Sequence, residues 1–192
     1  MVTDMRLDIA LIHYPVVNRK KEIIGSAVTN LDLHDIARAG KTFGVDTYWV
    51  VTPYAQQRAL TASIVGHWTD GYGGTVNPDR AGALSLIQIS SDLHEVLAKM
   101  TEQDGRRPLV VATSAGRLTK SISYTELQSE LHRATPVLLL LGTAWGLAPE
   151  VIDLVDATLP PINGPGAFNH LSVRSAASII LDRLLGKREN TA

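Results

Sequence analysis

The sequence predicts an α/β fold in which helices flank a mostly parallel sheet. Short runs of β-branched residues or leucine alternate along the chain with segments of helical periodicity. Most of these runs are continuously apolar, which is typical of strands buried on both faces of a parallel sheet. Since a strand, a helix and the next parallel strand form a right-handed crossover, the alternation favours helices on both faces of one sheet.

Six apolar runs are the candidate strands, and helical patterns separate them. They are Leu7–Ile12, Thr47–Val51, Leu84–Ile89, Leu109–Thr113, Val137–Leu141 and Ala157–Ile162. The carboxyl ends of parallel strands meet at one edge of a sheet, where ligands gather in open α/β folds. We therefore expect the loops after these runs to carry the function.

The first helix is predicted by its apolar spacing. A helix that begins near Asn30 has one buried stripe by the i, i+3, i+4, i+7 rule. That stripe comprises Leu33, Ile36, Ala37 and Gly40. His34, Arg38 and Lys41 then share a different stripe, with Asn30 at its N-terminal end. This polar stripe is either a phosphate-binding edge or a solvated helix face that Asn30 caps.

Capping patterns mark the starts of further helices. Thr52 followed by Pro53 places an N-cap before a proline at the first helical position. Ser91 precedes the helical pattern "DLHEVLAKM", and Ser123–Glu126 fits a capping box. Pro149 opens a short helix near the C-terminal end.

The last helical pattern spans residues 171–185 and stops at Gly186. Its second half is too apolar for a free surface helix and belongs in a core or a subunit interface. Two segments carry no regular pattern, His67–Arg80 and Asn163–His170. Loops of that length in a compact domain are usually functional or disordered.

Length and composition indicate one soluble domain over residues 1–192. The chain has 192 residues, a formal net charge of −1 and no cysteine. No apolar run approaches the ~20 residues that cross a bilayer, and no signal-peptide pattern is present, so we expect a cytoplasmic protein without membrane contact. The charge gives no global attraction to nucleic acid, so any polyanion would have to bind local basic clusters.

Several common chemistries lack their motifs in this sequence. No Gly-x-Gly-x-x-Gly follows the first strand, and no phosphate-binding loop ending in Gly-Lys-Ser/Thr occurs. No Gly-x-Ser-x-Gly nucleophile elbow is present. The six histidines form no His-x-His or His-Glu-x-x-His pair, so no metal site is expected.

Two glycine-containing loops follow candidate strands near the C-terminal end. Gly142 and Gly146 allow positive φ angles or a close approach of ligand to backbone, although they also suit a simple turn from strand to helix. The second loop, "NGPGAFNH", leads into a helix whose small residues permit close packing. His170 and Arg174 stand four residues apart at that helix start.

Together these features resemble the three motifs of the SPOUT superfamily of RNA methyltransferases. The first motif resembles "NLDLHDIARAGKTFGV", which supplies Asn30, Arg38, Phe43, Gly44 and Val45. The second resembles "LGTAWGLAPEV", which supplies Gly142, Gly146, Leu147 and Glu150 but lacks the family's Asn-Glu pair. The third resembles "PPINGPGAFNHLSVRSAASIILD", which supplies Ile162, Leu171, Val173 and Ala176. Ser172 and Arg174 replace the family's Asn and Ser. The chain is most similar to a compact bacterial branch of the superfamily.

The resemblance implies a deep trefoil knot at the C-terminal end and S-adenosylmethionine (SAM) bound in that knot. It implies a homodimer that methylates RNA, either tRNA or rRNA, at a base or a ribose. The residues it implies for the cofactor are Thr113, Ser114, Leu141, Gly142, Thr143, Gly146, Leu147, Ile162, Gly166, Asn169, His170, Leu171 and Ser175. Arg38 is the implied catalytic residue, supported by Asn30. His170 and Arg174 are secondary catalytic candidates.

The RNA would bind small basic clusters. The candidates are Asn18–Lys21, Arg38 with Lys41, or the group Arg106, Arg107, Arg117 and Lys120. Two alternatives to an RNA methyltransferase stay open at the level of sequence. One is an inactive module that binds SAM or S-adenosylhomocysteine as a sensor or scaffold. The other is a methyltransferase that acts on a small molecule.

Overall fold

A six-stranded sheet forms the centre of the molecule in the computed structural model, which describes residues 5–116 and 119–187. Its strand order is β5-β4-β1-β7-β6-β8, and all neighbouring strands are parallel. The bounds are β1 Leu7–Ile12, β4 Thr47–Val51, β5 Ile87–Ser90, β6 Leu109–Ala112, β7 Val137–Gly142 and β8 Ala157–Thr158. The predicted parallel α/β sheet is therefore confirmed.

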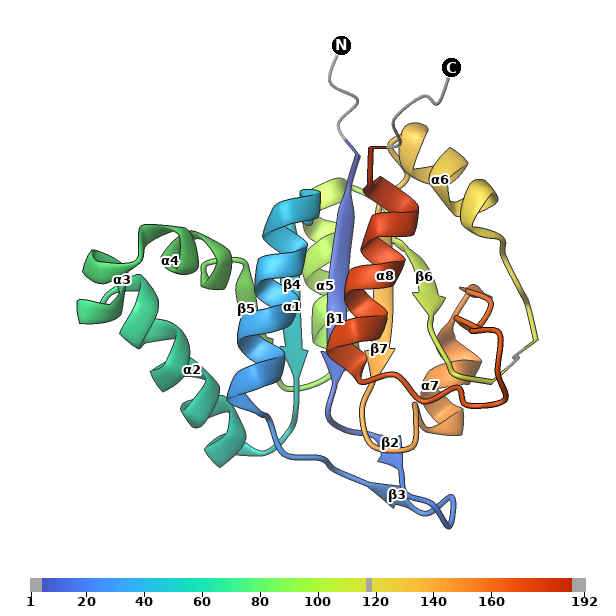
Figure 1. Ribbon diagram of the computed structural model, residues 1–192, viewed down its shortest axis with the longest axis horizontal. Coiled ribbons are helices and arrows are strands. Elements are labelled where there is room, and N and C mark those ends of the chain that lie inside the picture. Colours follow the sequence, from blue (N-terminus) through green and yellow to red (C-terminus); the bar gives the residue numbers. More distant parts are fainter. Residues whose placement is uncertain (1–4, 117–118, 188–192) are drawn as a thin grey trace.

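Helices cover both faces of this sheet (Figure 1). One face carries α1 (Asn30–Phe43), α4 (Pro78–Leu84), α6 (Tyr124–His132) and α8 (Val173–Leu185). The other carries α5 (Leu93–Asp104) and α7 (Pro149–Leu154). All six residues of β1 are buried, because its side chains alternate between the two layers.

The segment predicted to be irregular at 67–80 is mostly helical, so that prediction was wrong. It contains the end of α2 (Ala55–Thr69), all of α3 (Tyr72–Val76) and the start of α4. A Cβ on Gly73 would lie 2.8 Å from the Trp68 ring, so glycine permits the tight packing of α3 on α2. The Asn77 side chain caps α4, with Pro78 behind it. Helices this short, which depend on a glycine contact and a side-chain cap, show no helical spacing of apolar residues in the sequence.

A short antiparallel hairpin, β2 (Val16–Val17) and β3 (Ile23–Ile24), was not predicted. Two-residue strands are too short to show an alternating pattern. Val16 also pairs with Leu147, in the chain that follows β7. This bridge pairs the hairpin with a segment that lies far from it in the sequence.

Several predicted boundaries are corrected by the structure. Thr52 is buried and its N–H donates to the carbonyl of Ser90, so it continues β4, and Tyr54 is the N-cap of α2. Thr29, not Asn30, caps α1 by accepting from the N–H of Asp32. Asp92, not Ser91, caps α5.

Three strands are shorter than predicted, and one of them, β6, ends at Ala112 rather than at Thr113. Leu84 ends α4, so β5 begins only at Ile87. The strand from Ala157 ends at Thr158, and after the N–H of Leu159 donates to the carbonyl of Ala112 the pairing stops, since Pro160 and Pro161 lack the N–H that a sheet ladder requires. The capping box at Ser123, the start of α7 at Pro149 and the stop of α8 at Gly186 are confirmed. None of the helices in the described residues is long and apolar enough to cross a membrane.

A buried carboxyl group lies at the amino-terminal end of β1. Asp8 is fully buried, and the indole N–H of Trp49 donates to its Oδ2 at 2.8 Å. Its Oδ1 has no hydrogen-bond partner within the described residues, and the nearest Arg6 nitrogen is 3.8 Å away. Burial raises the pKa of Asp8 from 3.8 to about 6.

We predict that Asp8 weakens stability above pH 6. A raised folded-state pKa contributes stability that is fully present below pH 3.8 and is lost as the pH rises through about 6. The shift corresponds to about 3 kcal/mol at neutral pH. Asp8→Asn should therefore be more stable than the wild type in urea unfolding at pH 7 and nearly equal at pH 4. A stability difference that does not change with pH would contradict this assignment.

Candidate active site

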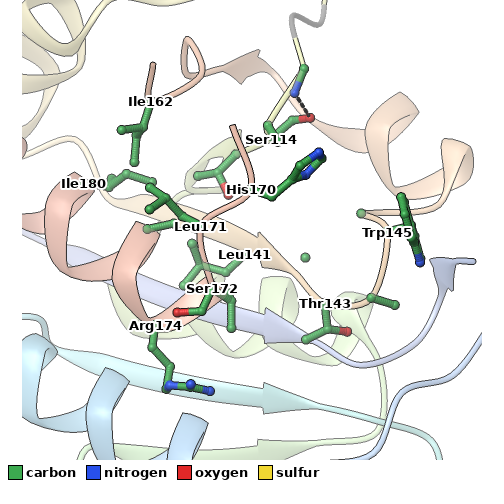
Figure 2. Close-up of a pocket in the computed structure, with 18 of the residues that line it drawn as sticks. Ser114, Leu141, Thr143, Trp145, Ile162, His170, Leu171, Ser172, Arg174 and Ile180 are labelled. Carbon is green, nitrogen blue, oxygen red and sulfur yellow. Dashed lines mark hydrogen bonds between the residues drawn. The ribbon is translucent and has the colours of Figure 1, made fainter. Parts of the chain in front are cut away.

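A pocket of about 700 Å³ opens where β1, β7 and β6 end (Figure 2). Cofactor and ligand sites typically measure about 300–1,000 Å³. Its lining comes from the β2–β3 turn, the segment before α1, the loops after β6 and β7, and the chain from β8 into α8. The pocket thus lies at the predicted edge of the sheet, and residues far apart in sequence meet there.

The loop after β7 is a tight turn that requires small residues. A Cβ on Gly142 would lie 3.0 Å from the backbone nitrogen of Leu147, so two stretches of main chain are in close contact there. Ala144 and Gly146 have positive φ angles of 51° and 113°. The N–H of Gly146 donates to the carbonyl of Thr143 at 3.0 Å and closes the turn. This geometry brings the main chain of the loop to the pocket wall.

The opposite wall is the irregular chain between β8 and α8. Among the described residues, no backbone-to-backbone hydrogen bond involves the main chain from Pro160 to Leu171. Its peptide groups are therefore available to a ligand. The side chain of Asn169 holds the segment in place by donating to the carbonyl of Ala115 at 2.9 Å and to Asn163 Oδ1 at 3.1 Å. The apolar part of the pocket is lined by Leu141, Leu159, Ile162, Leu171, Val173 and Ile180.

The polar end of the pocket holds an ion pair between α1 and α8. Arg174 donates to Asp32 Oδ1 at 2.8 Å, and its Nε lies 3.3 Å from the carboxylate of Asp35. The other oxygen of Asp32 accepts from the hydroxyl of Thr29 at 2.6 Å. Asp32 is only 6% exposed, so its carboxylate is fixed in one orientation. Arg174 and Asp32 therefore form a rigid, charged end wall.

A chain of hydroxyl groups connects this pocket to a buried histidine. Thr143 Oγ1 donates to the carbonyl of Ile12 at 2.9 Å, and Ser26 Oγ lies 2.6 Å from Thr143 Oγ1. Because the hydroxyl hydrogen of Thr143 is already donated to Ile12, Ser26 must donate to Thr143. Ser26 Oγ then accepts from Nδ1 of His13 at 2.9 Å. The carbonyl thus fixes the direction of every bond in the chain, and His13 carries its proton on Nδ1.

His13 is neutral at physiological pH. Burial lowers the pKa of His13 to about 4, although the nearby Asp32 carboxylate partly opposes the shift. Its Nε2 is buried and has no hydrogen-bond partner within the described residues. The imidazole thus orients Ser26 without adding charge to the pocket.

Ten of the predicted cofactor residues line this pocket. They are Thr113, Ser114, Leu141, Gly142, Thr143, Gly146, Ile162, Asn169, His170 and Leu171. Three others do not. The Leu147 side chain packs into the core under β2, and Gly166 lies at the exposed outer part of its loop. The Ser175 hydroxyl faces Ser172 at the start of α8.

Neither predicted catalytic residue lies in the pocket. Asn30 is the exposed first residue of α1, and Arg38 is exposed two turns further along that helix. Their stripe is not wholly solvated, because His34 packs edge-on against Trp68 with ring centres 5.5 Å apart. The cations that line the pocket are instead Arg174 and Lys21.

Sequence reasoning missed the polar pocket residues Ser26, Thr29 and Asp32, which lie before α1 or in its first turn. Ser26 and Thr29 stand in a stretch without a regular pattern, whereas Lys21 belongs to the basic cluster Asn18–Lys21 that was predicted as a contact for RNA. Asp32 carried a usable signal, because it shares the buried face of α1 with Ile36 and Gly40 at i+4 and i+8. A carboxylate on a buried helix face usually has a partner, and here that partner is a residue of α8.

The predicted basic clusters are distributed over different parts of the molecule. Arg106 and Arg107 lie before the amino-terminal end of β6, opposite the pocket edge, and Arg107 pairs with Asp156 at 2.7 Å. Lys120 donates to the carbonyl of Val155. Arg117 lies outside the described residues. No group of three His, Asp or Glu within the described part of the chain is arranged to hold a metal ion.

Solved structures support the fold. A TrmH/SpoU tRNA-modifying enzyme of Aquifex aeolicus matches with a TM-score of 0.58 and 17% identity over 95% of this chain and 75% of that one. The SpoU methyltransferase AviRb of Streptomyces viridochromogenes, in complex with the cofactor AdoMet, matches with a TM-score of 0.59 and 17% identity. That match covers 96% of this chain and 58% of AviRb. At such identities the likeness establishes the fold alone.

Sequence relatives are more similar. A protein of Oleidesulfovibrio alaskensis named tRNA (guanine-N(1)-)-methyltransferase is 46% identical over 177 residues, and its Nitratidesulfovibrio vulgaris counterpart is 44% identical over 180. Each match covers 92% of this chain, but the chain spans only 41% of the length of either relative. A protein of Aquifex aeolicus is 37% identical over 93% of this chain and 88% of its own length.

A protein family described as SAM-dependent RNA methyltransferase matches residues 6–186. That span includes every strand of the sheet and every segment that lines the pocket. The chain therefore belongs to this family of SAM-dependent RNA methyltransferases.

Proposed function

We propose that the pocket at the carboxyl edge of the sheet binds SAM and that the chain methylates tRNA or rRNA there. The observation that carries this proposal is the pair of facing walls with accessible main chain. One is the tight turn from Gly142 to Gly146, and the other is the unpaired main chain from Pro160 to Leu171. In this proposal the second wall and α8 form a C-terminal trefoil knot, within one domain that acts as a cytoplasmic homodimer.

The apolar part of the pocket suits the adenosine of the cofactor. Ile162 and Ile180 lie on the side of the pocket opposite Trp145 (Figure 2). An aromatic base between aliphatic side chains loses water-exposed apolar area, and peptide groups beside it satisfy its polar edge. SAM supplies a methyl group on a sulfonium, and the protein has to position the acceptor against it.

The polar end suits the acceptor nucleotide. Arg174 is held by two carboxylates, and a guanidinium stays protonated at all relevant pH values. It therefore orients the acceptor or stabilises developing negative charge rather than removing a proton. Lys21 and Ser26 also line the pocket.

The experiment that tests the proposed function is transfer of a labelled methyl group from SAM to total tRNA and rRNA. Radioactivity in RNA is the expected result. Binding of SAM without transfer to either RNA would contradict the enzyme and support a sensor or scaffold. Label that appears only in small metabolites would support a small-molecule methyltransferase.

We predict that Gly142→Ala weakens SAM binding about tenfold, since the new Cβ would press on the backbone of Leu147 and displace the turn. Isothermal titration calorimetry with SAM measures the effect. The matched control is Gly82→Ala in α4, because a Cβ there meets nothing within 4 Å and Gly82 does not line the pocket, so affinity should change less than about twofold. Equal affinities for the two variants would place the cofactor elsewhere.

We predict that Arg174→Lys lowers kcat/KM for RNA methylation about a hundredfold while SAM affinity changes little. Lysine keeps a charge beside Asp32 but loses the planar fork that reaches Asp32 and Asp35 together. Arg38→Ala in the same assay tests the residue that the family resemblance implies. Full activity of Arg174→Lys together with loss of activity in Arg38→Ala would show that Arg38, and not Arg174, orients the acceptor.

A further inference from the structure

The β2–β3 hairpin is fastened to the turn that forms one wall of the pocket. The N–H of Val17 donates to the carbonyl of Gly146 at 2.9 Å, and the N–H of Trp145 donates to the carbonyl of Val17 at 3.0 Å. Figure 1 shows the hairpin beyond the ends of the central strands, at the bottom of the view. Its position relative to the pocket is therefore set by main-chain bonds rather than by flexible side chains.

The tip of this hairpin is a built turn. Asn18 Oδ1 accepts from the N–H groups of Lys20 and Glu22 at 2.8 and 3.0 Å, and Asn18 Nδ2 donates to the Glu22 carboxylate at 2.7 Å. Lys21 has a positive φ of 66°, an uncommon conformation for a residue with a side chain. The turn thus holds Arg19, Lys20 and Lys21 as three consecutive cations, and the only acidic neighbour in the turn is engaged by Asn18.

These cations lie beside an exposed aromatic ring at the mouth of the pocket. Lys21 lines the pocket, and the Arg19 guanidinium lies 5.9 Å from the centre of the Trp145 ring. Trp145 is 57% exposed although burial would favour so large an apolar side chain. On the opposite wall Phe168 is 79% exposed. Trp145 is therefore an exposed aromatic ring that lines the pocket with cations beside it, whereas Phe168 is exposed on the segment of the opposite wall but does not line the pocket.

Single-stranded RNA matches this combination better than a protein surface does. Its phosphates pair with Arg and Lys, and its unstacked bases stack on aromatic rings and guanidinium planes. The chain carries a net charge of −1, so attraction to phosphate depends on a local cluster of this kind. The other paired arginines, Arg106 and Arg107, lie at the opposite end of the strands.

We propose that the β2–β3 turn and Trp145 form the docking surface for the RNA strand that flanks the methylated nucleotide. Lys21 binds the phosphate of the nucleotide in the pocket, Arg19 and Lys20 bind the next phosphates, and a flanking base stacks on Trp145. This inference rests on the proposed function, because it assumes that the acceptor in the pocket belongs to RNA.

The first experiment compares Arg19→Gln/Lys20→Gln with the charge-matched control Arg106→Gln/Arg133→Gln. Arg133 is an exposed residue beside α6, and Arg106 donates to the carbonyl of Ala134. The probe is a fluorescein-labelled single-stranded RNA of about 12 nucleotides, long enough to cover a typical strand-binding groove. Affinity is measured by anisotropy from low to physiological salt, with the enzyme saturated with S-adenosylhomocysteine.

We predict that the hairpin variant binds this RNA about tenfold more weakly than the wild type at physiological salt. The slope of log Kd against log salt should fall by about 1.4, since each phosphate contact on a single strand contributes about 0.7. The control variant should keep the wild-type affinity and slope, and both should bind SAM normally. Wild-type RNA affinity and slope in the hairpin variant would overturn the proposal.

The second experiment isolates the stacking contact. Trp145→Leu should weaken RNA binding about tenfold, while Trp145→Phe, which keeps an aromatic face, should retain most of the affinity. Trp145 fluorescence should be quenched by the RNA, so the quenching should disappear in Trp145→Phe. Equal affinities for the Leu and Phe variants, or a parallel loss of SAM affinity, would show that Trp145 does not act as a base platform.

The outcomes separate this inference from the proposed function. Methyl transfer to RNA by the wild type, together with unchanged KM in both hairpin and Trp145→Leu variants, refutes the docking surface and leaves the function intact. Absence of RNA methylation and of RNA binding in the wild type refutes both. A raised KM with unchanged kcat in the two variants supports the docking surface.

Discussion

The parallel pairing of β1 with β7, and of β7 with β6, is the constraint on which the rest of the structure depends. Ile12 lies opposite Gly142, and Ala112 lies opposite Leu140, so the three central strands end within a residue or two of one another. Parallel strands send their following loops out at the same edge. The segments after residues 12, 112 and 142 are therefore forced together, and the pocket forms where they meet.

Because these strands are buried on both faces, most of their side chains pack in the core and do not reach a ligand. β7 presents five buried residues in a row, and helices cover it on each side. Polar groups are confined to the strand ends, with Asp8 at one end of β1 and His13 just beyond the other. Each is displaced from its ordinary ionisation by burial, toward the neutral form in both cases. Burial thus favours the uncharged forms of the Asp8 carboxyl and the His13 imidazole at the two ends of β1.

The charged part of the pocket is assembled from the two ends of the chain. Asp32 and Arg174 are 142 residues apart, and their contact fixes the first turn of α1 against the first turn of α8. Arg174 stands where the third motif that this chain resembles has a serine, and its partner lies on another helix. This arrangement explains how the chain can depart from the third motif and still present a rigid polar end wall. The turn between β2 and β3 adds one further cation, Lys21, from a third region of the sequence.

The sequence by itself determined the sheet, the faces of α1 and the two glycine loops, because these depend on local composition and on the periods of strand and helix. The runs at 7–12, 47–51 and 137–141 were predicted as buried strands, and they form β1, β4 and β7. Tertiary structure alone decided that Arg174 rather than Arg38 lies in the pocket, and that Lys21 and Trp145 share its rim. It also decided that residues 67–80 fold as helices. These outcomes depend on contacts between distant segments, such as Val17 with Gly146 and Asp32 with Arg174, and no local pattern encodes the partner.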